Sequence, residues 1–155
     1  MNDVSMKQLV SLSQDLNKAS DSLSKQIAKA ESALNEVKLG VWAWVKVRST
    51  YQPESDLTIN GKPAAVTEVE YLGYGKHRGK WCLLYSTEYE EYPDEDFRSV
   101  VPLLEAPRQE RIDAVDKLPE LIRALEKNAK ELADKANAKA LQVADFVSAL
   151  DGAKR

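Results

Sequence analysis

The sequence predicts an α+β fold in which a small antiparallel β-barrel or twisted sheet is inserted between two long, antiparallel, coiled-coil-like helices. Every tryptophan and tyrosine of the 155-residue chain lies between Gly40 and Leu104, where apolar and polar residues alternate. The flanking segments are polar and alanine-rich, and their apolar residues recur every three or four positions, as in a helix. We therefore expect an N-terminal helix in residues 1–39, a β domain in 40–104, and a short helix plus a long helix in 105–155.

The N-terminal segment has a narrow apolar seam that indicates one partner helix. The seam steps by 3, 4, 3, 4, 4, 3, 4 and 3 residues, a heptad pattern with one stutter between Leu23 and Ile27. At about 100° per residue it spans only about 80° of the helix. Gly40 is placed to end the helix. The seam consists of Leu9, Leu12, Leu16, Ala19, Leu23, Ile27, Ala30, Leu34 and Val37.

The central segment begins with the alternation of a strand, in which Val41, Ala43, Val45 and Val47 alternate with Trp42, Trp44, Lys46 and Arg48. Further strands are expected at 66–72, 81–87 and 98–104, and a short hairpin at Asn60-Gly61. Because the first strand is apolar on both faces, we expect both faces to be covered; an open binding platform is the alternative.

The C-terminal segment predicts a short helix from Pro107 to Val115, then a long helix that ends near Gly152. The long helix has an apolar sector of about 160°, which indicates more than one neighbour. In an antiparallel pair with Val37 beside Leu118, the stutters of the two long helices are offset by about eight residues. Either the register differs or the helices also pack against a second copy. The wide apolar sector of the long C-terminal helix favours a second copy, so we expect a homodimer. The seam consists of Leu118, Ile122, Leu125, Ala129, Leu132, Ala136, Ala140, Val143, Val147 and Leu150.

The net charge of −3 comes from the central segment. Residues 39–104 carry seven cations and ten anions, whereas the two flanking segments are each balanced. Bulk charge therefore disfavours nucleic-acid binding without excluding it. The single cysteine cannot form an intramolecular disulfide. No targeting segment or membrane-length apolar run is present in the sequence, so we expect a cytoplasmic protein that does not enter a membrane.

A tyrosine-rich acidic stretch follows the third expected strand. Tyrosine rings with interleaved carboxylates can enclose a cation, or can present negative charge to a basic partner in imitation of a phosphate backbone. The alternative is a solvated loop whose tyrosines cover the edge of the barrel. The Asp-x-Asp-x-Asp-Gly spacing of a calcium loop is missing. The candidate partner-binding residues are Tyr85, Tyr89, Glu90, Glu91, Tyr92, Asp94 and Asp96.

A basic turn precedes the third expected strand. Lys76, Arg78 and Lys80 can contact phosphates, and Tyr74 or Trp81 offers a stacking face. The alternative is a solvated hairpin turn. Its glycines lack the spacing of a phosphate-binding loop.

Catalytic chemistry has little support in this sequence. His77 is the only histidine and lies in a glycine-flanked turn, and Cys82 has the setting of a small core residue. No zinc-type cluster can be formed, and any catalytic triad would require His77. We predict no catalytic residue, no metal and no cofactor.

Residues 40–104 resemble a Tudor or SH3-like small barrel, and the residues that carry the resemblance lie between Gly79 and Leu104. The resemblance is carried by the hairpin into Trp81-Cys82-Leu83-Leu84-Tyr85, the acidic Asp94-Glu95-Asp96 and the closing Ser99-Val100-Val101-Pro102-Leu103. It implies recognition of a cationic side chain, such as methylated lysine or arginine, by an aromatic cage. Tyr85, Tyr89 and Tyr92 would then supply the rings, and Asp94 and Asp96 the acid.

These patterns together predict a non-enzymatic adaptor or inhibitor. Its β domain would engage a basic macromolecular partner, and its helices would mediate self-association. The alternative is a nucleic-acid-binding barrel that uses the basic turn.

Overall fold

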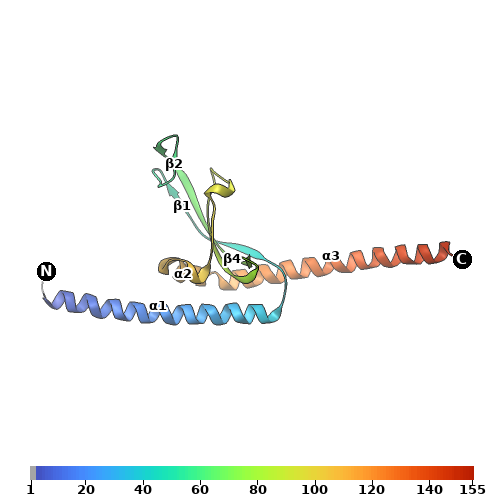
Figure 1. Ribbon diagram of the computed structural model, residues 1–155, viewed down its shortest axis with the longest axis horizontal. Helices are drawn as coiled ribbons and strands as arrows, with labels where there is room; N and C mark the ends of the chain where they lie inside the picture. The colour runs from blue at the N-terminus through green and yellow to red at the C-terminus, as the bar shows by residue number, and fades with distance from the viewer. Residues whose placement is uncertain (1–2) are drawn as a thin grey trace.

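The computed structural model describes residues 3–155 as an α+β fold with three helices, a four-stranded antiparallel sheet and a small two-stranded sheet (Figure 1). The helices are α1 (Asp3–Val37), α2 (Arg108–Val115) and α3 (Leu118–Ala153). Two short 3-10 helices are η1 (Glu95–Phe97) and η2 (Leu103–Glu105). The strands are β1 (Ala43–Gln52), β2 (Thr58–Ile59), β3 (Lys62–Pro63), β4 (Val66–His77), β5 (Lys80–Tyr89) and β6 (Ser99–Pro102).

The larger sheet is open. Its strand order is β1-β4-β5-β6, and each strand is antiparallel to its neighbour. A closed barrel, one of the two expected forms, is not found in the described chain, because β1 and β6 lie on opposite sides of the long β4–β5 hairpin. The predicted hairpin at Asn60-Gly61 is confirmed as β2–β3, with both turn residues at positive φ (52° and 76°).

A β-bulge in β1 changes which face Arg48 occupies. The register shifts between Lys46, which pairs with Tyr71, and Arg48, which pairs with Glu70. Strict alternation would place Arg48 on the same face of the sheet as Trp42 and Trp44. Val47 is the extra residue of the bulge, and it shifts Arg48 to the other face. The expected alternation is therefore correct for Trp42 to Val47 and wrong at Arg48.

The helix ends differ slightly from the sequence expectation. α1 ends at Val37, and Lys38 rather than Gly40 takes the first left-handed conformation, with φ of 54°. The short helix after Pro107 is confirmed, with Pro107 at its N-cap position. α3 continues through Gly152 to Ala153, because an exposed glycine near a helix end costs too little to stop it.

One hydrophobic core joins all three segments of the chain. Fully buried residues come from α1 (Ile27), β4 and β5 (Leu72 and Leu83), and α3 (Leu121 and Leu125). Leu103 of η2 and Ala114 of α2 close the same cluster. The helices therefore cover one face of the sheet near its base, and the far end of the sheet projects away from them (Figure 1).

The outer halves of both long helices are exposed. From Lys130 to the C-terminus every residue is exposed, as is every residue from Met6 to Ala19. The two chain ends lie at opposite ends of the molecule (Figure 1). Antiparallel pairing of the two helices along their length is therefore not established within one chain. None of the helices in residues 3–155 has both the length and the apolar character needed to cross a membrane.

Candidate functional site

The sheet ends in a strongly acidic surface at the point farthest from the helices. We call this surface the acidic end and define it as residues 53–68 and 88–98, which meet where β4 begins and β5 finishes (Figure 1). Glu68 pairs with Tyr89 in the sheet, and the Glu90 amide donates to the Thr67 carbonyl oxygen at 3.0 Å. The acidic end contains two cations, Lys62 and Arg98, against nine carboxylates: Glu54, Asp56, Glu68, Glu88, Glu90, Glu91, Asp94, Glu95 and Asp96.

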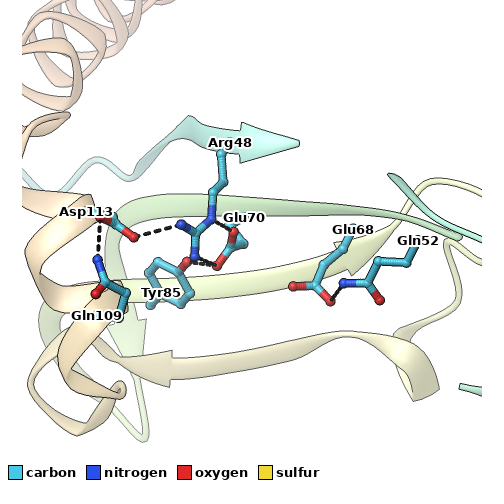
Figure 2. A network of polar contacts seen from close by, with 7 residues as sticks. All are labelled: Arg48, Gln52, Glu68, Glu70, Tyr85, Gln109 and Asp113. Atoms are coloured by element: carbon cyan, nitrogen blue, oxygen red, sulfur yellow. Dashed lines mark hydrogen bonds and ion pairs between the residues drawn. The ribbon is translucent and has the colours of Figure 1, made fainter. Parts of the chain in front are cut away.

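Three of these carboxylates have side-chain or backbone partners. The Gln52 side-chain amide donates to Glu68 at 3.4 Å (Figure 2). Arg98 forms an ion pair of 3.1 Å with Glu88. The Glu91 carboxylate accepts hydrogen bonds from the Thr67 amide at 2.6 Å and the Thr67 hydroxyl at 2.7 Å. These bonds lower the pKa of Glu91, the amide having the larger effect. Glu91 therefore closes the loop onto β4 rather than being free for a partner.

The other loop carboxylates face solvent. Glu90, Asp94, Glu95 and Asp96 are exposed, and among residues 3–155 none of the four belongs to an ion pair. The Tyr92 and Phe97 rings meet edge to face, with centroids 5.9 Å apart, and hold the loop in shape. This arrangement leaves a group of negative charges that form no ion pair within the described residues.

The pKa shifts of neighbouring groups report the negative potential. Burial raises the pKa of Tyr71, and the charges of Glu88 and Glu90 raise it further. Burial and then the charges of Glu68 and Asp56 raise the pKa of Tyr89. Both pKa values are raised because burial and, to a smaller extent, the nearby carboxylates disfavour the charged phenolate.

Tyr85 does not belong to the acidic end. Its side chain is 4% exposed, and its hydroxyl donates to the buried carboxylate of Glu70. Figure 2 shows the Tyr85 ring below Arg48 and next to Gln109 and Asp113 of α2. Of the predicted partner-binding residues, the structure thus brings together Tyr89, Glu90, Glu91, Tyr92, Asp94 and Asp96, and separates Tyr85. Period-two alternation from Leu83 was a signal that Tyr85 faces the core.

The basic turn lies at the opposite end of the β4–β5 hairpin. Lys76, Arg78 and Lys80 are exposed, which fits both a phosphate-contacting turn and a solvated hairpin turn. Tyr74 is 3% exposed and its hydroxyl donates to Asn35 of α1 at 2.5 Å, so it offers no stacking face. Trp81 stacks on Tyr74 with ring centroids 5.4 Å apart.

A pocket of about 740 Å³ lies beside the basic turn, between the hairpin and the end of α1. Its lining includes cations at Lys38, Arg78 and Lys80 and carboxylates at Glu31 and Glu105. Cys82 also lines it, and burial raises the pKa of this thiol, with Glu31 and Glu105 adding to the effect. Such a thiol is a poor nucleophile.

The outer face of the sheet has a groove lined by tryptophans. The sequence pattern predicts that this face is covered. Trp42 is 64% exposed, so the open-platform interpretation fits this residue. Trp44 is half-buried because its ring lies over Gly73, and the Arg98 guanidinium lies 5.7 Å from its centroid. The groove, of about 310 Å³, is lined by Trp42, Trp44, Gly75, Lys76, Trp81 and Leu84.

Comparisons with known proteins add no assignment. No protein-family model matches the chain, and searches of curated proteins and of solved structures also found no match. Within residues 3–155 no three histidine, cysteine, aspartate or glutamate side chains form a group that could hold a metal ion.

Proposed function

We propose that this protein is a non-enzymatic adaptor or inhibitor that binds a basic macromolecular partner through its acidic end, while its helices mediate self-association. The supporting observation is the group of exposed carboxylates Glu90, Asp94, Glu95 and Asp96, none of which forms an ion pair in residues 3–155, at the end of the sheet that projects away from the helices. Their mutual repulsion is unfavourable in the free protein. A basic surface offsets this repulsion on binding and is attracted over a long range.

The test reverses charges that have no role in the fold. A variant with Glu90→Lys, Asp94→Lys and Glu95→Lys leaves Glu91, Glu88 and the aromatic pair intact. Because these side chains are exposed in a loop, we expect the melting temperature to stay near that of the natural protein. We expect affinity capture from the source cell to lose the partner, and association with the purified partner to slow by roughly tenfold or more at low salt.

A matched control changes the net charge by the same amount elsewhere. Asp21→Lys, Glu36→Lys and Glu126→Lys place three exposed reversals on the helices. This control should retain the partner. If both variants capture the same partner at the same rate in low salt, the acidic end is only solvated surface and the proposal is wrong.

A second candidate function, nucleic-acid binding, is favoured by one observation. Lys38 of α1 joins Arg78 and Lys80 around the pocket beside the basic turn. Phosphate contacts from these cations would make the affinity fall steeply with salt. Replacing Lys76, Arg78 and Lys80 by alanine should then abolish binding of labelled DNA or RNA. The absence of any shift by the natural protein at about 50 mM salt would remove this candidate.

A further inference from the structure

The outer halves of α1 and α3 each expose an apolar seam. On α1 the exposed fractions are 53% at Leu9, 63% at Leu12 and 47% at Leu16. On α3 they are 60% at Val143, 47% at Val147 and 46% at Leu150. An isolated helix of this length is only marginally stable in water, and an amphipathic helix gains most of its stability from packing. Each half therefore needs a partner helix.

The partner of each half cannot be the other half of the same chain. Within the described residues α1 and α3 share the core near Ile27, Leu121 and Leu125. From there the outer half of α1 runs to one end of the molecule, and the outer half of α3 runs to the other (Figure 1). The two exposed seams are therefore separated by the body of the protein.

We infer that the outer half of α1 packs antiparallel against the outer half of α3 of a second copy. A single two-fold axis forms both pairs at once, because each chain offers an α1 seam at one end and an α3 seam at the other. This inference rests on the self-association in the proposed function and specifies its geometry. The sequence predicts an antiparallel helix pair within one chain. In this dimer the antiparallel pair forms between two chains instead.

The seam sequences favour one register. Aligning the stutter of α1 with that of α3, at Ala136–Ala140, places Leu16 beside Val147 and Leu12 beside Leu150. The same register places the small Ala19 beside Val143, and the small Ala140 beside Leu23. Small residues therefore face larger ones, as close packing requires. The neighbours of the seams include the uncharged Ser13 and Ala144 and few charged residues: Asp15 on α1, and Lys139 and Asp151 on α3.

The area available matches that of a stable dimer. Seven side chains on or beside the two seams are 46–64% exposed: Leu9, Leu12, Leu16, Val143, Phe146, Val147 and Leu150. Because each of these side chains is already about half-buried, on the order of 50 Å² of its apolar area remains to be buried, so the fourteen side chains of two copies together bury roughly 700 Å² of apolar surface. The polar atoms beside them bring the total toward the ~1,600 Å² of a standard interface.

Cysteine pairing between chains tests this arrangement. In a Cys82→Ala background, one chain receives Leu16→Cys and a second chain, with a different mass tag, receives Val147→Cys. Both positions are half-exposed in the single chain, so folding should not suffer. We expect the coexpressed pair to form a disulfide-linked heterodimer, and each variant alone to stay uncrosslinked, because equivalent seams lie at opposite ends of the dimer.

The control replaces Leu16→Cys by Lys18→Cys, which lies on the opposite side of α1 and should give roughly tenfold less covalent heterodimer with Val147→Cys. Covalent dimers from Leu16→Cys alone, or an intrachain disulfide in the doubly substituted chain, would overturn the inference. If the natural protein has twice its 17.3 kDa mass but the mixed pair does not crosslink, this helix pairing is wrong while self-association stands. The acidic-end variants test the partner separately.

Discussion

At the scale of single residues, the stability of the fold depends on how the buried carboxylate of Glu70 is neutralised. Glu70 is 4% exposed and accepts two hydrogen bonds from Arg48 and one from the Tyr85 hydroxyl (Figure 2). Arg48 also donates to Asp113 of α2 at 2.7 Å. The bond to Glu70 is the largest cause of the raised pKa of Arg48. The network therefore ties β1, β4 and β5 to α2 and satisfies a charge that would otherwise be costly to bury.

Replacement of Arg48 tests this network. Arg48→Met leaves the Glu70 carboxylate buried without its cation, so we expect a loss of about 3 kcal/mol in the free energy of unfolding. Arg98→Met is the matched control, because its ion pair with Glu88 is exposed on both sides and should cost less than about 1 kcal/mol. Urea denaturation measures both. Equal losses for the two variants would contradict the assigned role of Glu70.

At the scale of elements, the position of Trp44 depends on a glycine in the neighbouring strand. A Cβ atom on Gly73 would lie 2.6 Å from Cδ2 of Trp44, closer than any normal contact. Gly73→Ala must therefore displace the ring from the sheet and from Arg98, and we expect it to cost about 1–3 kcal/mol with a change in tryptophan fluorescence. A double-mutant cycle with Trp44→Leu should recover most of that loss.

Gly75→Ala is the control for this effect. The Cβ atom there would meet Trp42 Cβ at 3.5 Å, an ordinary contact, so we expect stability within about 1 kcal/mol of the natural protein. A loss at residue 75 as large as that at residue 73 would show that general strand disruption, rather than the ring, is responsible.

Local sequence patterns predicted the elements but not how they combine. Heptad spacing predicted α1, and the Asn60-Gly61 turn predicted the β2–β3 hairpin, because both depend on neighbours in the chain. The bulge before Arg48 and the bond from Arg48 to Glu70, 22 residues further along the chain, depend on the pairing of β1 with β4 and could not be predicted from local sequence. The composition of residues 88–96 was enough to predict that this segment is an exposed acidic surface. Whether the sheet closes into a barrel and whether Trp42 is exposed depend on how whole strands and helices are arranged in space.

At the scale of the whole molecule, charge and apolar surface are separated. The acidic end points away from the helices, the basic turn lies near the end of α1, and the apolar seams lie along the two outer helix halves. The proposed dimer presents two acidic ends, one from each chain. A partner with two basic sites would then be held more tightly than by one copy, through effective concentration alone.

The last prediction concerns the seam of α3. Val143 is 60% exposed in the single chain, so Val143→Lys buries no charge in the body of the protein and should leave its core intact. In the proposed interface the same lysine would be buried without a partner, which costs several kcal/mol at each of two sites. We expect light scattering at tens of micromolar to fall from twice 17.3 kDa to 17.3 kDa, with a melting temperature that no longer depends on concentration.

Leu141→Lys is the matched control because Leu141 is 70% exposed and lies on the opposite side of the same helix. It adds the same charge to the same element without reaching the seam, so the dimer should persist. A Val143→Lys protein that keeps its dimeric mass would contradict the proposed interface. If the natural protein is itself 17.3 kDa at that concentration, its helices do not mediate self-association and the exposed seams require another partner.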